Sequence, residues 1–324
     1  MKLITLITEP QDYSLRALDT YRSLGKVYLW PELKTTEREG ILRAANVIVL
    51  RLAYKIDKLW LEKMPNLKVI ATPTTGLNHV DVAEAKKRGI KVISLRGRTS
   101  FLKYIPSTAE KTMTLLLASM RKLPWAFDHV LSGGWDRNLF KGNQLLGKTL
   151  GILGFGRLGK IVTRYAKAFG MPVIACDPHL APKVFERYGV HRVSMEDLFK
   201  KSDIVSIHTS LTPETTNLVR EKHLRLMKPT AHLINTARGE IIDEQALLKA
   251  LKKKWLAGVA LDVLWNEAGD GSHLKNNPLI AYARQSNNLI IVPHLGGATY
   301  EAMAITEDFI ADLVRKHFLQ GQSQ

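Results

Sequence analysis

Three side chains suited to proton and hydride chemistry lie in the second half of the chain. Arg238 lies in INTARGEIID, Glu267 in ALDVLWNEAGDG and His294 in IIVPHLGGAT. A histidine that titrates near neutral pH can take a hydroxyl proton as hydride leaves the carbon. A carboxylate beside it would orient the ring and favour its charged form. An arginine can bind a substrate carboxylate and stabilise charge on the reacting oxygen. The three residue types together suit the oxidation of a hydroxy acid.

These residues would meet only if the strands before them are parallel neighbours. Apolar runs precede the three segments, at Ala231–Asn235, Ala257–Leu261 and Leu289–Val292. The carboxyl ends of parallel strands lie along one edge of a sheet, where ligands bind. Taken singly, an arginine or histidine at a strand end is usually structural or solvated. Spacing alone therefore leaves both interpretations open.

The stretch from Lys148 to Asp177 has the pattern strand, glycine turn, helix, strand and acid. Apolar runs at Thr149–Leu153 and Pro172–Cys176 flank a helical pattern from Lys160 to Phe169. The helix should end at the glycine that follows it. This order of elements is that of a βαβ unit that binds a dinucleotide.

The glycines Gly154, Gly156 and Gly159 of this stretch form the pattern G-x-G-x-x-G. The first permits a tight turn, the second keeps side chains off a pyrophosphate, and the third lets helix and strand pack closely. The helix N-terminus presents free N–H groups to the phosphates. Asp177 can accept hydrogen bonds from both ribose hydroxyls and would repel a 2′-phosphate, which favours NAD over NADP. A βα turn without a ligand is the alternative, but the flanking elements and the acid all fit a dinucleotide site.

The elements that must position these residues follow from an alternation of short apolar runs with helical patterns. This alternation predicts an α/β fold of two doubly wound, Rossmann-like parallel sheets. The last helical pattern, Thr299–Phe318, has no strand after it and is expected to return to the first domain. The predicted organisation is a discontinuous, flavodoxin-like substrate-binding domain, residues 1–105 plus 298–324, and an NAD-binding Rossmann domain, residues 106–297. Further predicted elements are strands at Leu3–Ile7, Val27–Leu29, Val47–Leu50, Val69–Ala71, Val92–Ser94 and Ile204–His208, and helices at Tyr13–Leu24, Asp81–Arg88, Ser107–Met120, Met195–Lys200, Thr216–Leu218 and Glu244–Lys252.

Three loops of the first domain carry residues suited to anion binding. Thr75, Gly76 and Leu77 follow a predicted strand, and the glycine permits a turn whose N–H groups point at a substrate carboxylate. An ordinary βα turn is the alternative. Arginines in the other two loops would hold a second anionic group such as a phosphate, or would be solvated charge. They are Arg51, Arg96 and Arg98, with Lys103 nearby.

The composition is that of an ordinary globular protein and narrows the possible partners. Of the 324 residues, 45% are hydrophobic and 24% charged, and the formal net charge is +17. No apolar run reaches the length of a membrane span or a signal peptide. No nucleic-acid motif accompanies the basic charge, so we expect solvated surface and a field that draws anionic ligands. Cys176 is the only cysteine, which excludes an intrachain disulfide and a thiolate metal cluster. We predict a cytoplasmic protein with no metal and no nucleic-acid or membrane partner.

Several longer motifs resemble those of one enzyme family over nearly the whole chain. They are GILGFGRLGK, IVSIHTSLTPETTNLV, LINTARGEIIDEQALLKAL, ALDV with Glu267, and VPHLGGAT. The sequence resembles the D-isomer-specific 2-hydroxyacid dehydrogenase family, which includes D-3-phosphoglycerate dehydrogenase. The resemblance implies NAD as cofactor, a small 2-hydroxy or 2-keto acid as substrate and a homodimer.

The resemblance also implies roles for individual residues. Arg238, Glu267 and His294 would be catalytic, with His294 the acid and base. Arg238 would also bind the substrate, and Asp262 would hold the nicotinamide carboxamide. The implied coenzyme-binding residues are Gly154, Gly156, Arg157, Leu158, Gly159, Asp177, Thr209, Thr236, Ala237, Asp262, Gly296 and Gly297.

Two points distinguish this chain within the family. Ala268 follows Glu267 where the family commonly has proline, so the loop is expected to be longer and looser. The arginines at 51, 96 and 98 make 3-phosphoglycerate the first substrate candidate, with glyoxylate, hydroxypyruvate and branched keto acids as alternatives. The rival hypothesis is a non-catalytic, dinucleotide-sensing protein of corepressor type, against which the intact arginine, glutamate and histidine set counts.

Overall fold

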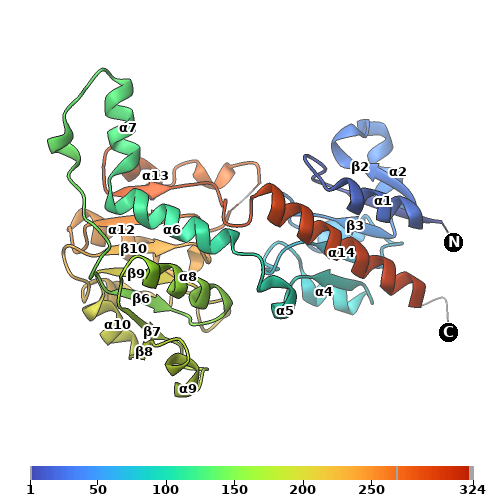
Figure 1. Ribbon diagram of the computed structural model, residues 1–324. Helices are drawn as coiled ribbons and strands as arrows, with labels where there is room; N and C mark the ends of the chain where they lie inside the picture. The colour runs from blue at the N-terminus through green and yellow to red at the C-terminus, as the bar shows by residue number, and fades with distance from the viewer. Residues whose placement is uncertain (1, 268, 321–324) are drawn as a thin grey trace. The chain divides into compact units, whose positions relative to one another are not determined.

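The computed structural model describes residues 2–267 and 269–320, and these form two compact units (Figure 1). Unit 1 holds described residues 2–105, 269–270 and 298–320. Unit 2 holds residues 106–267 and 271–297. Each unit is built around its own parallel sheet with helices packed on it.

Among the residues described, unit 1 contains a 5-stranded parallel sheet with the order β2-β1-β3-β4-β5. This is the order of the flavodoxin-like doubly wound fold, and strand order reverses between β1 and β3. Its strands are β1 (Leu3–Ile7), β2 (Gly25–Leu29), β3 (Val47–Val49), β4 (Val69–Thr72) and β5 (Lys91–Ser94). Its helices are α1 (Leu15–Leu24), η1 (Trp30–Glu32), α2 (Thr35–Ala44), α3 (Lys58–Glu62), α4 (Val82–Lys87), α5 (Thr99–Leu102) and α14 (Tyr300–Gln320).

The last helix, α14, packs with the N-terminal part of the chain. The apolar residues Ile310 and Val314 of α14 are buried in one cluster with Tyr21 of α1 and Val49 of β3. The buried Glu307 accepts a hydrogen bond from the backbone N–H of Ser14 at 2.8 Å and pairs with Arg51. Sequence-distant segments therefore complete one core.

Among the residues described, unit 2 contains a 7-stranded parallel sheet with the order β12-β11-β10-β9-β6-β7-β8. Read from β6, this is the Rossmann order with one further strand, and it reverses between β6 and β9. The strands are β6 (Leu150–Leu153), β7 (Val173–Cys176), β8 (His191–Arg192), β9 (Ile204–Ile207), β10 (His232–Asn235), β11 (Gly258–Leu261) and β12 (Leu289–Ile291). The helices are α6 (Ser107–Met120), α7 (Leu123–Leu131), η2 (Arg137–Phe140), α8 (Arg157–Ala168), α9 (Pro182–Glu186), α10 (Met195–Lys201), α11 (Glu221–Leu224), η3 (Gly239–Ile241), α12 (Glu244–Lys252), η4 (Ser272–Leu274) and α13 (Pro278–Ala283).

Both faces of the unit 2 sheet are buried, as the near-continuous apolar strands require. Successive residues of β10 alternate between two clusters, with Leu233 in one and Ile234 in the other. Helices α6 and α8 cover the Ile234 face, and α10 and α12 cover the Leu233 face (Figure 1). The loops at the carboxyl ends of the strands are thereby held on a rigid base.

The predicted fold class, two doubly wound parallel sheets, is confirmed. One predicted helix is wrong, because the chain from Thr216 to Leu218 is a turn. The hydroxyl of Thr215 donates to the carbonyl of Ser210 at 2.7 Å and accepts from the N–H of Thr212 at 2.7 Å. Such side-chain bonds to the backbone compete with helix formation. The prediction that Ala268 begins a longer, looser loop falls on a residue outside those described.

Helix α7 is not among the helices that the sequence analysis predicts. Proline is favoured in the first turn of a helix because its fixed φ is helical and the N–H it lacks would be unpaired there. Pro124 lies at that point of α7. Pro124 therefore marks the start of this helix.

Within residues 2–267 and 269–320, no helix combines the length and the apolar character that crossing a membrane requires. The same residues contain no group of three or more histidine, cysteine, aspartate or glutamate side chains arranged to hold a metal ion.

Candidate active site

The three strands before the candidate catalytic residues are adjacent and parallel. Asn235 at the end of β10 pairs with Leu261 at the end of β11, and Leu261 pairs with Ile291 at the end of β12. Arg238, Glu267 and His294 lie in the loops that follow these strands. The condition that the sequence analysis set for their convergence is therefore met within unit 2.

Glu267 and His294 form a direct hydrogen bond. The distance between Glu267 Oε2 and His294 Nδ1 is 2.5 Å. The other carboxylate oxygen, Oε1, accepts the backbone N–H of Leu264 at 2.8 Å. Burial tends to raise the pKa of Glu267, but the bond to His294, the Leu264 N–H and the charge of Arg238 outweigh it, so its pKa is lowered. Glu267 is held as a carboxylate that orients the imidazole ring.

The backbone of His294 is held in a sparsely populated conformation. Its φ is +52°, in the left-handed region, where a non-glycine residue is uncommon and often functional. Its N–H donates to the carbonyl oxygens of Asp262 at 2.8 Å and of Val292 at 3.0 Å. These bonds fix the backbone at His294 and with it the direction of the imidazole side chain at the end of β12.

Asp262 is a buried carboxylate that closes the turn after His294. Its oxygens accept the N–H groups of Leu295 at 2.7 Å and Gly296 at 2.8 Å. Burial raises its pKa, and these two bonds and the charge of His294 oppose the rise. A Cβ at Gly296 would lie 2.9 Å from Asp262 Oδ2, so only glycine leaves the carboxylate this close to the chain.

Arg238 is partly buried in the loop after β10. Its Nη1 donates to the carbonyl of Ala237 at 2.6 Å. Burial lowers the pKa of Arg238, while the charges of Glu267, Glu240 and Asp262 raise it. An arginine retains its charge under such conditions. The cation therefore lies within electrostatic reach of the carboxylate that holds the histidine.

The glycine turn after β6 has the close approaches that the motif requires. Gly154 has a φ of +91°, and a Cβ there would lie 2.6 Å from the backbone nitrogen of Thr209. A Cβ at Gly159 would lie 2.5 Å from the carbonyl oxygen of Gly154. By contrast, nothing lies within 4 Å of a Cβ built on Gly156, the residue before α8. Open space at the helix N-terminus is what a pyrophosphate needs.

Asp177 follows β7 and lies against this turn. Its Oδ2 accepts the N–H of Phe155 at 2.9 Å, and its Oδ1 accepts the N–H of His179 at 3.0 Å. Cys176, the residue before it, is half-buried. Burial and the charge of Asp177 raise the pKa of the Cys176 thiol. The acid is thus fixed beside the glycine turn by the backbone.

The remaining predicted coenzyme residues also belong to unit 2. Thr236 is buried, and its hydroxyl is 2.8 Å from that of Thr112 on α6. Burial lowers the pKa of Arg157 in the first turn of α8. Leu158, Thr209 and Ala237 are partly buried, and Gly297 is exposed.

The predicted substrate loops belong to unit 1. In the loop after β4, the hydroxyl of Thr74 donates to the carbonyl of Gly76 at 2.8 Å, while Thr75 and Leu77 are partly or fully exposed. The guanidinium of Arg51 bonds to Glu307 and donates to the carbonyl of Gln11 at 2.9 Å. Arg96 and Arg98 are exposed, and no described carboxylate forms a salt bridge with either. Arg96 and Arg98 thus differ from Arg51, whose guanidinium is already hydrogen-bonded, and Lys103 lies over the ring of Tyr104, 4.6 Å from its centroid.

Sequence reasoning missed two residues near these sites. The side chain of Asn235 binds the backbone on both sides of Arg238. His208, after β9, lies 2.8 Å from the Ser206 hydroxyl through Nε2, and burial lowers its pKa to about 4. Each lies at the end of a strand that the apolar pattern predicts, and that position was the available signal.

Comparison with known proteins decides which chemistry this arrangement serves. Residues 113–296 match the family model described as D-isomer specific 2-hydroxyacid dehydrogenase, NAD binding domain. The chain belongs to this family. The predicted NAD-dependent oxidoreductase of D-2-hydroxy acids is therefore confirmed, and the alternative of a non-catalytic dinucleotide sensor finds no support.

Individual members of the family are similar over most of the chain. A glyoxylate reductase of Thermococcus litoralis is 38% identical over 304 residues, which cover 91% of this chain and 86% of that protein. A D-3-phosphoglycerate dehydrogenase of Methanocaldococcus jannaschii is 36% identical over 318 residues, 98% of this chain but only 57% of that longer protein. A D-lactate dehydrogenase of Aquifex aeolicus, solved with NAD and lactic acid, is 28% identical and superposes with a TM-score of 0.82 over 98% of this chain and 96% of that chain.

Proposed function

We propose that this enzyme interconverts a small 2-keto acid and its D-2-hydroxy acid with NAD(H), using Arg238, Glu267 and His294. The observation that carries the proposal is the 2.5 Å hydrogen bond between Glu267 and His294 at neighbouring strand ends. Arg238, on the next strand along, is close enough for its charge to lower the pKa of Glu267. A base, its orienting carboxylate and a cation on adjacent loops are the groups this reaction needs.

The residues of unit 2 fit a dinucleotide. The open space at Gly156 and the N-terminus of α8 suit a pyrophosphate, and Asp177 suits a ribose. When bound, NADH supplies the hydride and NAD accepts it.

The side chains of this enzyme transfer the proton and stabilise the charges of the reaction. In the direction of reduction, His294 Nε2 gives its proton to the keto oxygen as that oxygen gains charge. Glu267 holds Nδ1 and stabilises the imidazolium before transfer. Arg238 binds the substrate carboxylate and the developing alkoxide. In the direction of oxidation, the same imidazole takes the hydroxyl proton.

The Arg238 role is tested with a panel of 2-keto acids and NADH. We expect Arg238→Ala to lower kcat/KM by ~10²–10³-fold, as loss of one charged stabilising donor typically does. Arg238→Lys keeps the charge without the planar fork and should retain only part of the activity. Both variants should still bind NADH by fluorescence titration. Wild-type turnover by Arg238→Ala would refute the proposal.

For the substrate we favour a small, unphosphorylated 2-keto acid such as glyoxylate. The similarity to glyoxylate reductases supports this choice, and so does the engagement of the Arg51 guanidinium by Glu307 and Gln11. Arg96 and Arg98 are exposed and form no salt bridge with a described carboxylate, which keeps 3-phosphoglycerate as the second candidate. The second candidate is correct if two results are found. The parent enzyme must prefer a phosphorylated substrate, and the double variant Arg96→Ala/Arg98→Ala must raise the KM for that substrate but not the KM for unphosphorylated keto acids.

We also propose a homodimer, with α7 in its interface. The helix is strongly apolar, and none of its residues is buried. Phe127 is 61% and Leu131 71% exposed, and Trp135 in the following loop is 91% exposed. Figure 1 shows α7 and this loop extending from the body of unit 2. Exposed apolar clusters of this kind mark association surfaces.

The dimer is tested by light scattering. Phe127→Glu/Leu131→Glu should give a monomer, whereas Leu15→Glu, at a comparably exposed leucine of α1, should leave the mass unchanged. A monomeric parent protein would exclude the proposal.

The predicted cytoplasmic location is supported by the single, half-buried cysteine.

A further inference from the structure

The loops that carry Arg238 and Glu267 touch directly at Gly239. A Cβ on Gly239 would lie 2.1 Å from the carbonyl carbon of Leu264 and 2.2 Å from its oxygen. Any side chain there would push the two loops apart. Leu264 is also the residue whose N–H binds Glu267. The contact at Gly239 therefore determines how closely the Glu267 loop approaches the Arg238 loop.

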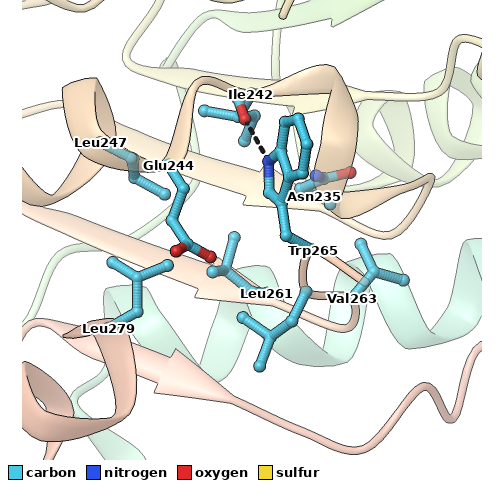
Figure 2. A pocket seen from close by; sticks show the side chains of 10 residues that line it. Asn235, Ile242, Glu244, Leu247, Leu261, Val263, Trp265 and Leu279 are labelled. Carbon is cyan, nitrogen blue, oxygen red and sulfur yellow. Dashed lines mark hydrogen bonds between the residues drawn. The ribbon is translucent and has the colours of Figure 1, made fainter. Parts of the chain in front are cut away.

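Trp265 makes a second connection between the same loops. Its indole Nε1 donates to the carbonyl of Ile242 at 2.8 Å (Figure 2). Ile242 directly follows η3, the turn that begins after Arg238. Trp265 lies two residues before Glu267. The indole of Trp265 therefore connects the loop that carries Glu267 to the loop that carries Arg238.

Asn235 makes the third connection, within the Arg238 loop. Its side chain is fully buried, with Nδ2 donating to the carbonyl of Arg238 at 2.8 Å and Oδ1 accepting the N–H of Ala237 at 3.0 Å. Both polar atoms of the Asn235 side chain are thus hydrogen-bonded to the backbone, one at Ala237 and one at Arg238. These bonds fix the direction of the Arg238 guanidinium. An aliphatic residue of similar size would leave both peptides free to rotate.

The three residues also share the wall of a small cavity beneath the loops. Asn235, Gly239 and Trp265 line it together with apolar side chains such as Leu247 and Leu279 (Figure 2). The Gly239 contact and the Trp265 hydrogen bond join the two loops, and Asn235 fixes the Arg238 loop itself. The N–H of Asn266 also lies 3.4 Å from Glu240 Oε1, between the same loops.

We propose that Asn235, Gly239 and Trp265 form an inter-loop latch, whose members are positioning residues for Arg238 and Glu267. The proposal rests on the catalytic roles assigned to those two residues above. None of the three latch residues needs to touch substrate or coenzyme. The latch acts by holding the distance between the substrate-binding cation and the carboxylate that orients His294, where a shift of about 1 Å can cost ~10²-fold in rate.

The first test is Trp265→Phe, which keeps an aromatic ring and removes the N–H donor. We expect kcat to fall ~10-fold or more and the pH profile of kcat/KM to shift, because Glu267 would no longer be fixed against His294. Trp255→Phe is the matched control, since Trp255 is partly buried in the same unit and packs under Arg225, 4.2 Å from the guanidinium carbon to the ring centroid. Wild-type kcat and pH profile in folded Trp265→Phe would overturn the latch.

The second test separates positioning from mere folding. Asn235→Ala should raise KM for the keto acid at least ~5-fold and should weaken NADH binding less, because it releases the Arg238 carbonyl as well as the Ala237 N–H of the coenzyme set. Asn235→Asp keeps the acceptor for the Ala237 N–H and should fall between the parent and the alanine variant. Asn288→Ala, which loses only a bond from the Tyr282 hydroxyl, is the control. Equal losses of NADH and keto-acid affinity would contradict the proposal.

A double-mutant cycle distinguishes failure of the latch from failure of the proposed function. If Asn235 acts through Arg238, Asn235→Ala should have little further effect in an Arg238→Ala background. If Arg238→Ala itself keeps wild-type activity, the proposed function fails and the cycle is not needed. If Arg238→Ala is impaired but the two changes are additive, the catalytic assignment stands and the latch is wrong.

Discussion

At the scale of residues, the candidate site depends on side chains that the backbone holds in place. Glu267 is fixed by the Leu264 N–H, and Asp177 by the N–H groups of Phe155 and His179. His294 is fixed through its own left-handed backbone. Preorganised groups of this kind lose little free energy to reorganisation during reaction.

Asp177 gives a prediction about coenzyme choice. Asp177→Asn retains an oxygen that can accept a backbone N–H but removes the charge that repels a 2′-phosphate. We expect the ratio of kcat/KM with NADH to that with NADPH to fall ~10-fold or more, a change of about 1.4 kcal/mol. Initial rates with both coenzymes measure it. An unchanged ratio would show that another residue discriminates between the coenzymes. Asp203→Asn is the control, because Asp203 binds the N–H of Thr149 at the opposite end of β6 from the glycine turn.

The types and spacing of the residues predicted a hydride-transfer site, and the three strand ends proved to be neighbours. The sequence did not reveal Asn235, Gly239 or Trp265 as a connected set. Their connection depends on a contact between loops 25 residues apart, at a distance that only coordinates give. Arg51 was assigned to substrate because Glu307, its partner, is 256 positions away and gave no local signal.

At the scale of elements, the N-terminus of α12 holds two acidic side chains in different environments. Asp243 caps α12 by accepting the N–H of Ala246 at 3.0 Å. Glu244 follows in the first turn, and its Oε2 is buried with no hydrogen-bond partner among the described residues. Figure 2 shows its carboxyl group among Leu247, Leu261 and Leu279. Burial raises the pKa of Glu244, and a hydrogen bond with Asn277 opposes the rise.

A raised carboxyl pKa favours the folded state only where the group is protonated. That contribution is full below the unfolded pKa, about 4.3, and is lost as pH rises through the higher folded pKa. Glu244→Gln should therefore raise Tm at pH 8 by about 2 °C, and the difference should shrink toward pH 4. Calorimetry against Glu196→Gln, an exposed first-turn glutamate of α10, measures it. A lower Tm for Glu244→Gln at pH 8 would show that the charge is stabilising.

Elements were predicted best where apolar runs are uninterrupted. The predicted strands of both sheets follow such runs and agree with them to within about two residues, the usual uncertainty of an element's end. The short strand β8, His191–Arg192, was not predicted, because its two residues are polar and exposed. Thr216–Leu218 failed because threonine hydroxyls bind nearby backbone groups instead of permitting a helix. Helix α7 was missed because the proline in its first turn, Pro124, was not recognised as a helix start.

At the scale of the whole molecule, we expect acid stability to depend on the buried His232 and the partly buried His208. His232 is buried against Ser119 of α6, with 2.7 Å between Nδ1 and the hydroxyl oxygen. Burial lowers the pKa of His232, and that of His208, to about 4. Both residues belong to unit 2, whose sheet also holds the candidate active site.

A lowered histidine pKa makes the unfolded chain bind protons before the folded chain does. The stability contributed by neutral His208 and His232 is full above about pH 6.5 and is lost as pH falls toward 4, by up to ~3 kcal/mol for each. We expect Tm to fall steeply over that range. His232→Asn should flatten the fall, and the exposed His191→Asn should not. Identical pH curves for the parent and His232→Asn would exclude His232 as the cause.

The position of the sole cysteine provides an internal probe. Cys176 immediately precedes the acid assigned to the ribose, and its raised pKa keeps the thiol slow to react. Alkylation by a maleimide therefore reports on one atom only, without any engineered label. If a dinucleotide occupies this edge of the sheet, saturating NADH will slow the labelling, and washing it out will restore the original rate.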